Sequence, residues 1–229
     1  ESAAMAADTT RKKPPGRFRT VAFVAAVAVV CALILSLTAS ALRPRIEANQ
    51  RLDVVANILA SLGVFGDQLP PAAAAGSGEI EAFYNDRLTK RLVSPAGAVV
   101  DSDRDPLQVK PWNERKVKPR DELLLPVYVL TAADSDEVVA YSLPIWGKGL
   151  WGAIYGYLAL EADAETVRGI TFLSNHKETP GLGARIEEAA FREQWEGKRI
   201  FGADDALTPI RVVKGEAPAQ GPKADHQVD

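Results

Sequence analysis

Residues 153–173, AIYGYLALEADAETVRGITFL, indicate the type of fold in this chain. Ala153 to Leu160 mixes aromatic and aliphatic residues as a buried strand does, and Val167 to Leu173 has the same character. A short polar connection, Asp163-Ala164-Glu165, lies between the two runs. A connection this short predicts that residues 153–161 and 167–173 pair as antiparallel strands.

The segments on either side predict an α+β domain. Val138 to Leu143 and Ile210 to Val213 are further β-like runs, and Ala184 to Trp195 carries apolar residues at helical spacing. We expect this helix to pack on a largely antiparallel sheet, with regular structure beginning near Glu137. Two segments rich in proline, glycine or charge, 66–80 and 101–125, are expected to be exposed connections.

Residues 20–42, TVAFVAAVAVVCALILSLTASAL, contain no charge. An apolar helix of about 20 residues crosses the hydrocarbon core of a bilayer, so these residues predict a transmembrane helix. The alternatives are a buried core helix and a signal peptide cleaved after Ala39-Ser40-Ala41, although the apolar core of a signal peptide has only about 7–15 residues. Residues 1–19 are polar and basic and predict a disordered tail.

The charges around the predicted span indicate its orientation. Five basic residues precede it (Arg11, Lys12, Lys13, Arg17 and Arg19) and three follow it (Arg43, Arg45 and Arg51). This bias favours a cytoplasmic amino terminus and a main domain outside the cytoplasm. Residues 43–65 carry apolar side chains at helical spacing and predict a juxtamembrane helix, which Pro44 would set at an angle to the span. Residues 66–229 suffice for one soluble domain.

Composition excludes several classes of function. The net charge of −3 gives no basic field for nucleic acid. Cys31 lies within the predicted span, and the chain has only two histidines, so no metal site and no iron–sulfur cluster is predicted. Because no nucleophile–base arrangement or carboxylate pair stands out, we predict no catalytic residues. A protein of this composition that carries electrons needs an organic cofactor.

One glycine-rich motif is Gly147-Lys148-Gly149-Leu150-Trp151-Gly152. It satisfies the G-x-G-x-x-G pattern of dinucleotide-binding folds, but it leads into a predicted strand where those folds have a helix. Two interpretations remain. The motif is a hairpin loop with a solvated lysine, or it forms a wall for a planar anionic ligand, with apolar surfaces from Trp146, Leu150 and Trp151 and a cation from Lys148.

A second motif, Glu178-Thr179-Pro180-Gly181-Leu182-Gly183, follows the strand that ends near Leu173. As local structure it predicts a turn leading into a helix, since proline fixes φ and glycine allows unusual backbone angles. Backbone amides at the start of such a helix are able to hold phosphate. His176, just before the motif, is expected to be an exposed turn residue.

The sequence resembles the NqrC component of the sodium-translocating NADH:quinone reductase at residues 147–163, 167–183 and 193–198 (GKGLWGAIYGYLALEAD, VRGITFLSNHKETPGLG and EQWEGK). The single amino-terminal span and Asn57-Ile58-Leu59 agree with this resemblance. It implies an FMN-binding domain with FMN esterified to a threonine of a Ser-Gly-Ala-Thr-x-Thr motif. That motif does not occur in the 229 residues and is expected just beyond Asp229. The two glycine-rich motifs, Trp146 and Asp229 would then flank the flavin.

The resemblance also implies a role in electron transfer within a complex of the bacterial inner membrane. The protein would relay electrons between an iron–sulfur partner and another flavin subunit, while other subunits bind NADH and ubiquinone. The main domain would be periplasmic. Two alternatives stay open: the RnfG component of the related Rnf complex, which also carries covalent FMN, and a membrane-tethered binding or assembly module without a flavin.

Overall fold

A computed structural model describes residues 16–64, 77–173, 177–218 and 224–229. The chain divides into two compact units, Glu1–Glu47 and Ala48–Asp229. Residues 1–15 of the predicted tail lie outside the described ranges, and its last three residues, 17–19, are helical.

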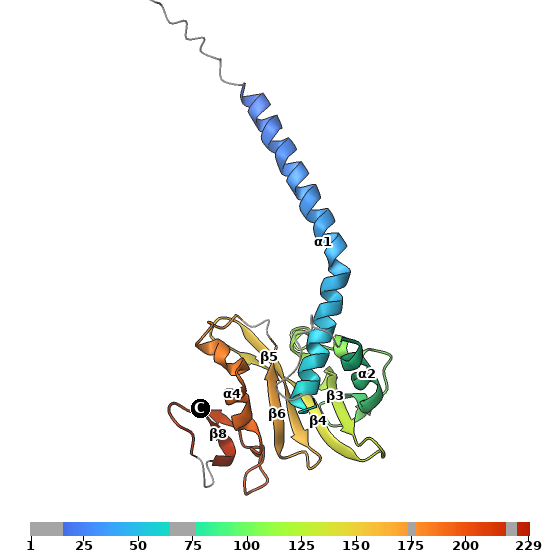
Figure 1. Cartoon of the computed structure of the whole chain (residues 1–229), viewed down its shortest axis with the longest axis vertical. Coiled ribbons are helices and arrows are strands. Elements are labelled where there is room, and N and C mark those ends of the chain that lie inside the picture. The colour runs from blue at the N-terminus through green and yellow to red at the C-terminus, as the bar shows by residue number, and fades with distance from the viewer. Residues whose placement is uncertain (1–15, 65–76, 174–176, 219–223) are drawn as a thin grey trace, which may run out of the picture. The chain divides into compact units, whose positions relative to one another are not determined.

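The first helix is α1 (Arg17–Ser61) (Figure 1). It has 45 residues and contains Pro44. The predicted span 20–42 and the predicted juxtamembrane helix 43–65 both fall in this one continuous helix, apart from residues 62–65 after its end. Proline removes one backbone hydrogen bond and crowds the preceding turn, which kinks a helix without necessarily ending it. An ion pair of 2.9 Å between Arg43 and Glu47 joins successive turns across Pro44.

Within the described residues, α1 is the one helix that is long and apolar enough to cross a membrane. Its apolar residues in the unit 1–47 are exposed, among them Val21, Leu33 and Leu42. A core helix of a soluble domain would bury such side chains, so their exposure argues against that alternative.

The second unit is built on a six-stranded antiparallel sheet in the order β2-β1-β3-β4-β5-β6 (Figure 1). The strands are β1 (Leu88–Val93), β2 (Val99–Val100), β3 (Leu125–Thr131), β4 (Val138–Lys148), β5 (Ala153–Glu161) and β6 (Val167–Phe172). The predicted antiparallel pairing of the last two strands is confirmed. The α+β class with a largely antiparallel sheet is therefore confirmed, and β4 extends beyond the predicted end at Leu143 into the GKGLWG motif.

Regular structure begins well before Glu137, where the sequence analysis placed it. Helix α2 (Ser77–Arg87) overlaps the predicted connection 66–80 and leads directly into β1. The segment 101–125 is a connection as predicted, with only short helical turns in it. These are η2 (Pro106–Gln108), α3 (Pro111–Glu114) and η3 (Arg120–Glu122).

The last turns of α1 form the centre of the core in the second unit. Val55, Ile58 and Leu59 are completely buried, and burying one such side chain contributes about 1.5–3 kcal/mol. Gly169 of β6 allows this packing, because a Cβ atom there would lie 2.6 Å from the carbonyl oxygen of Ser61. The Ser61 hydroxyl shares a buried 2.8 Å hydrogen bond with the Ser142 hydroxyl of β4. The helix end is thereby fixed on the sheet.

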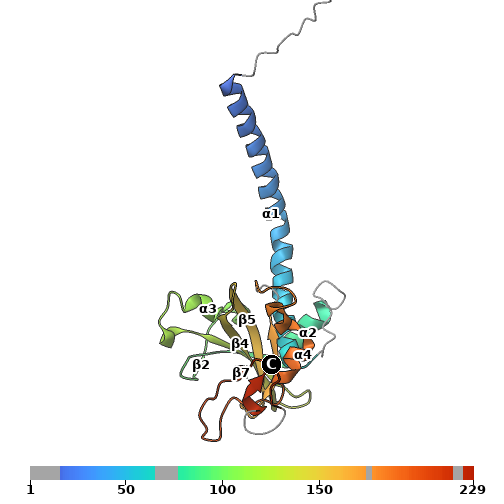
Figure 2. The same cartoon turned by 90° about the vertical axis from the view of Figure 1, so that its left-hand side faces the viewer.

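The predicted helix 184–195 is broken into three short pieces, η4 (Gly183–Glu187), α4 (Ala189–Arg192) and η5 (Glu193–Trp195). The break lies at Glu188, whose backbone is extended at φ −67° and ψ 142°. Tertiary contacts override the helical pattern here, since the Phe191 ring packs between Phe172 and Trp195. The chain ends in η6 (Ala224–His226) and β8 (Gln227–Val228), which pairs in parallel with β7 (Arg211–Val212), near the predicted strand 210–213 (Figure 2).

Candidate functional site

The GKGLWG motif forms the hairpin between β4 and β5. Gly147 and Lys148 end β4, and the amide of Gly149 donates a 2.7 Å hydrogen bond to the carbonyl oxygen of Gly152, which closes the turn. The motif leads into a strand, so it is not a dinucleotide-binding turn, as predicted. Leu150 and Trp151 at the tip are 81% and 64% exposed. The hairpin therefore presents two large apolar side chains to the outside.

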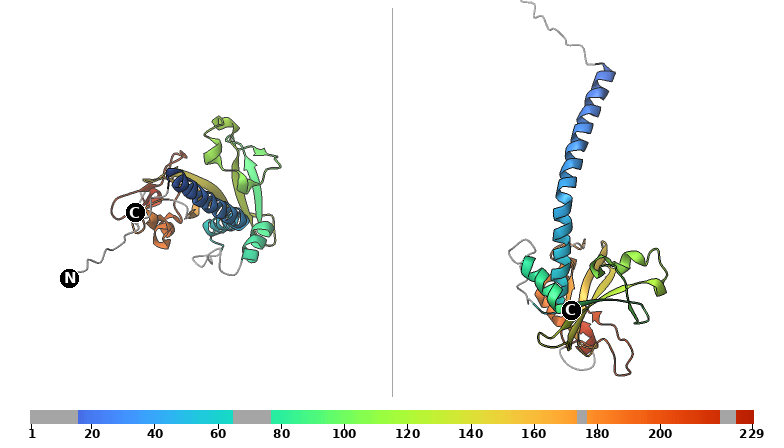
Figure 3. Two further views of the ribbon diagram at one scale, coloured as in Figure 1. Left: turned by 90° about the horizontal axis from the view of Figure 1, so that it is seen from above. Right: turned by 90° about the vertical axis from the view of Figure 1, so that its right-hand side faces the viewer.

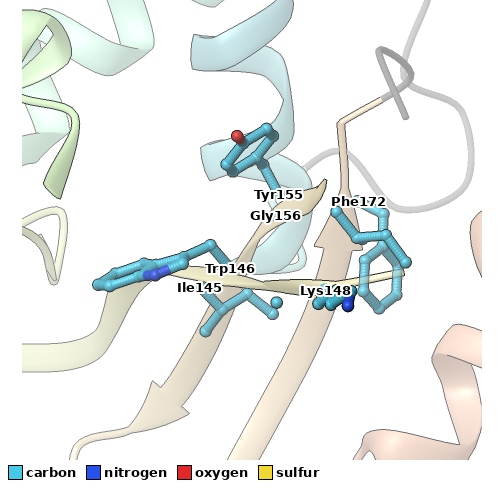
Figure 4. A pocket seen from close by; sticks show the side chains of 8 residues that line it. Ile145, Trp146, Lys148, Tyr155, Gly156 and Phe172 are labelled. Atoms are coloured by element: carbon cyan, nitrogen blue, oxygen red, sulfur yellow. The ribbon is translucent and has the colours of Figure 1, made fainter. Parts of the chain in front are cut away.

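A pocket of about 260 Å³ lies at the base of this hairpin. It is lined by Ile145, Trp146, Gly147, Lys148, Ile154, Tyr155, Gly156 and Phe172. Trp146 and Phe172 lie on opposite sides of the pocket (Figure 4). Gly156 between them is required by the neighbouring strand, because a Cβ atom there would lie 2.0 Å from the carbonyl oxygen of Thr171. We name this the hairpin pocket.

Glu178 joins the two glycine-rich motifs. Its Oε1 accepts a 3.2 Å hydrogen bond from the amide of Trp151 in the hairpin. A Cβ atom on Gly149 would lie 2.2 Å from the same oxygen, and one on Gly183 would lie 2.8 Å from Oε2. The glutamate therefore occupies space that two glycines, one in each motif, leave free.

The ETPGLG motif is the predicted turn, with the carbonyl oxygen of Thr179 accepting hydrogen bonds from the amides of Leu182 and Ala184 at 3.1 Å. Gly181 has a φ of +74°, a conformation that favours glycine. The turn leads into η4, a 3₁₀ helix of five residues. The expected helix start with phosphate-binding amides is not supported, because so short a helix has little dipole. Leu182 is 73% exposed.

A second pocket of about 320 Å³ lies beside this turn and reaches the last residue. It is lined by Leu182, Gly183, Arg185, Ile186, Glu188, Ala190, Phe191, Gln194 and Asp229. The Gln194 amide group holds Asp229 at both backbone atoms: Nε2 donates to the carbonyl oxygen (3.1 Å) and Oε1 accepts from the amide (2.7 Å). We name this the terminal pocket. The Phe172 and Phe191 rings, 6.3 Å apart, place it next to the hairpin pocket.

Six of the fourteen predicted site residues line these two pockets: Trp146, Gly147 and Lys148 line the hairpin pocket, and Leu182, Gly183 and Asp229 line the terminal pocket. The other eight belong to the two glycine-rich motifs but line neither pocket. The Trp146 ring, in addition to lining the hairpin pocket, packs against Trp112 of α3, with 6.1 Å between the ring centres. His176 lies outside the described residues. Among the residues that line the pockets, Tyr155, Phe172, Phe191 and Gln194 were not predicted as site residues. Gln194 had one signal, since it belongs to the quoted EQWEGK segment.

Comparison with known proteins identifies a family that matches this part of the chain. The family model of the FMN-binding domain matches residues 149–229 of this sequence. These residues include most of the hairpin motif, the ETPGLG turn and Asp229. The crystal structure of the NqrC component of Na(+)-translocating NADH-quinone reductase from Parabacteroides distasonis superposes with a TM-score of 0.64 at 28% identity, covering 82% of this chain and 83% of that one. The Shewanella oneidensis NqrC structure gives 0.62 at 26% identity, covering 78% and 82%.

Two relatives of similar sequence are the same NqrC component of Na(+)-translocating NADH-quinone reductase. The Yersinia pestis protein is 33% identical over 220 residues, which cover 90% of this chain and 79% of that protein. The Pseudomonas aeruginosa protein is 30% identical and covers 92% and 83%. Identity at this level extends over both units and most of each relative. This chain therefore belongs to the NqrC family of Na(+)-translocating NADH-quinone reductase subunits.

Proposed function

We propose that this protein is the flavin-carrying electron-transfer subunit of a sodium-pumping NADH:ubiquinone reductase, with FMN esterified to a threonine that follows Asp229. One observation carries the proposal: the two glycine-rich motifs and Asp229, far apart in the sequence, lie around two adjoining pockets. The match to the FMN-binding domain and the family membership support it.

The residues of both pockets fit a flavin mononucleotide. Ring systems bind best between apolar walls with a few well-placed polar groups, and here Phe172, Phe191 and Leu182 supply the walls. Lys148 in the hairpin pocket and Arg185 in the terminal pocket supply positive charge for a phosphate or an anionic ring. Arg185 is paired with Glu188 at 3.2 Å, so Lys148 is the better candidate for the ring.

Bound FMN would supply the one- and two-electron chemistry, and the protein would supply position and charge. Lys148 favours additional negative charge nearby by Coulomb attraction. The exposed side chains of Trp151 and Leu182 are suited to press on a planar ring and exclude water from it. Glu178 holds the two loops together, and Gln194 holds the backbone of Asp229, next to the proposed attachment site.

In the complex, this subunit would take electrons from an iron–sulfur partner and pass them to another flavin subunit, with NADH and ubiquinone bound by other subunits. The apolar part of α1 would anchor it in the bacterial inner membrane, with the amino terminus in the cytoplasm and the soluble domain in the periplasm. The excess of basic residues before the span supports this orientation.

The proposal is tested by asking whether the protein carries covalently bound flavin. The complete gene product is made together with its flavin transferase, denatured and separated on a gel, and flavin fluorescence should remain with the protein band. A band without fluorescence would reject the redox role and favour the tethered binding or assembly module. The RnfG alternative is not supported, because the relatives and the solved structures that this chain resembles are NqrC proteins.

A further inference from the structure

A third pocket, of about 540 Å³, lies beside the connection that follows α3. It is lined by Pro95, Arg115, Lys118, Arg120, Leu123, Leu125 and Trp146. Helix α3 lies on the opposite side of the second unit from α2 and α4 (Figures 2 and 3). Only Trp146 is shared with the hairpin pocket, and no lining residue is shared with the terminal pocket. We name this the cationic pocket.

The lining contains three positive charges and no negative one. The side chains of Arg115 and Arg120 form no hydrogen bond or ion pair with any described residue. Lys118 is held by Glu114 at 2.9 Å, and Glu114 also binds Arg104, whose hydrogen bond keeps the pKa of the glutamate below its usual value. Asp121 and Glu122 follow in the sequence but do not line the pocket. The two arginines are therefore available to an anion.

The rest of the lining is apolar. Leu123 is buried, and Leu125, Pro95 and Trp146 complete the wall. The Trp146 ring is fixed in place, because Trp112 packs on it and on Tyr155, with 4.7 Å between the Trp112 and Tyr155 ring centres. Small-molecule sites have volumes of about 300–1,000 Å³ and combine apolar walls with a few polar groups. The cationic pocket has both features.

We propose that the cationic pocket binds a small phosphate ester, with its phosphate on Arg115 and Arg120 and its apolar body against Trp146 and Leu125. Two planar guanidinium groups match the oxygens of a phosphate dianion better than those of a monovalent carboxylate. Neutralising the cluster also removes the repulsion between its like charges. The site does not depend on the flavin, so this proposal and the proposed function fail separately.

The test is calorimetric titration of the full-length protein in zwitterionic detergent, with detergent alone as the blank. The ligands are phenyl phosphate, inorganic phosphate and phenol. Phenyl phosphate should bind at least about tenfold more tightly than either of the others, since it alone uses both parts of the pocket. Dihexanoyl phosphatidic acid then identifies the source: tighter binding than phenyl phosphate indicates a lipid head group, and weaker binding a soluble ester.

The Arg115→Gln/Arg120→Gln variant should bind phenyl phosphate at least about tenfold more weakly. The matched control, Lys110→Gln/Lys116→Gln, removes two charges from the same segment at residues that do not line the pocket, and it should change the affinity less than about twofold. Equal losses in the two variants, or a phenyl group that adds nothing to phosphate binding, would overturn the proposal. Unfolding curves of both variants check that the fold is intact.

Discussion

Three glycines near the hairpin pocket differ in what a methyl group at each would meet. At Gly156 it meets the backbone of Thr171 at 2.0 Å, which moves only with the strand. At Gly149 it meets the ends of the Glu178 and Ile154 side chains, which are able to rotate away. At Gly147 nothing lies within 4 Å. The three positions should therefore respond to alanine in this order.

We expect Gly156→Ala to lower the free energy of unfolding by about 1–3 kcal/mol or more, through backbone displacement. Gly149→Ala should cost about 1 kcal/mol, the value of the hydrogen bond from Trp151 that Glu178 would lose on moving. Gly147→Ala should stay within about 0.5 kcal/mol of the parent. Urea unfolding measures all three, and a Gly149 variant as stable as the Gly147 variant would show that Glu178 does not link the two motifs.

Ionisation of the buried Tyr84 should lower the stability of the protein at alkaline pH. Its hydroxyl is buried and has no hydrogen-bond partner among the described residues. Burial raises the pKa of Tyr84 above its usual value, with a further contribution from Asp105. The folded protein therefore keeps a proton that the unfolded chain loses above about pH 10. The contribution of Tyr84 to the free energy of unfolding is therefore complete below about pH 10. It falls as the pH rises from there to the pKa of Tyr84 in the folded protein.

Tyr84→Phe should remove both the ionisable group and the unpartnered hydroxyl. At pH 7 we expect the variant to be as stable as the parent or more stable by about 1 kcal/mol. Above pH 10 it should lose less stability than the parent, although Tyr128 and Tyr157, whose pKa values burial also raises, continue to contribute. Urea unfolding at pH 7 to 11 tests this, and identical alkaline slopes would contradict it.

At the scale of elements, the sequence predicted β5, β6 and the first part of β4, and it missed β1 and β3. β5 and β6 were predicted, whereas β1 carries Lys90 and Arg91 in its middle, and Pro126 lies inside β3. β3 alternates half-buried and buried residues, but its sequence is apolar up to Thr131, so this alternation is not visible in the sequence. The prediction of one helix over residues 184–195 was wrong, because the packing of Phe191 against Phe172 and Trp195 overrides the local helical pattern.

The candidate site divides in the same way. The glycine-rich motifs were predictable, since glycine at a turn has a local cause. The link through Glu178, the pair Phe172–Phe191 and the contact of Gln194 with Asp229 join residues far apart in the sequence, and no local pattern specifies such partners. The resemblance supplied the approximate location, and the fold supplied the contacts.

The contact between Gln194 and Asp229 predicts how firmly η5 holds the segment after β8. In Gln194→Ala both hydrogen bonds are lost, and about 1 kcal/mol of local stability corresponds to a roughly fivefold faster exchange of the Asp229 amide hydrogen. Gln194→Glu keeps an acceptor for that amide and should exchange at an intermediate rate. Hydrogen exchange followed by mass spectrometry gives this result without a flavin. An unchanged rate in the alanine variant would show that Gln194 does not hold the segment.

At the scale of the whole molecule, α1 serves two purposes in different parts of its length. Its residues up to Glu47 belong to the first unit, whereas Val55, Ile58, Leu59 and the following Leu62 are completely buried in the core of the second. Truncation should separate these purposes. Without residues 1–42 the chain keeps every core residue, so it should be soluble without detergent and unfold cooperatively in urea.

Removing residues 1–62 deletes four completely buried aliphatic side chains, each worth about 1.5–3 kcal/mol, which approaches the whole stability of a typical domain. This longer truncation should therefore be unfolded or aggregate, as circular dichroism and size-exclusion chromatography would show. The shorter one should remain folded but no longer copurify with the other subunits of its complex, because it lacks the apolar part of α1 that we propose packs against neighbouring helices in the membrane. If it still copurified, assembly would depend on the soluble domain alone, and the apolar helix would be only an anchor.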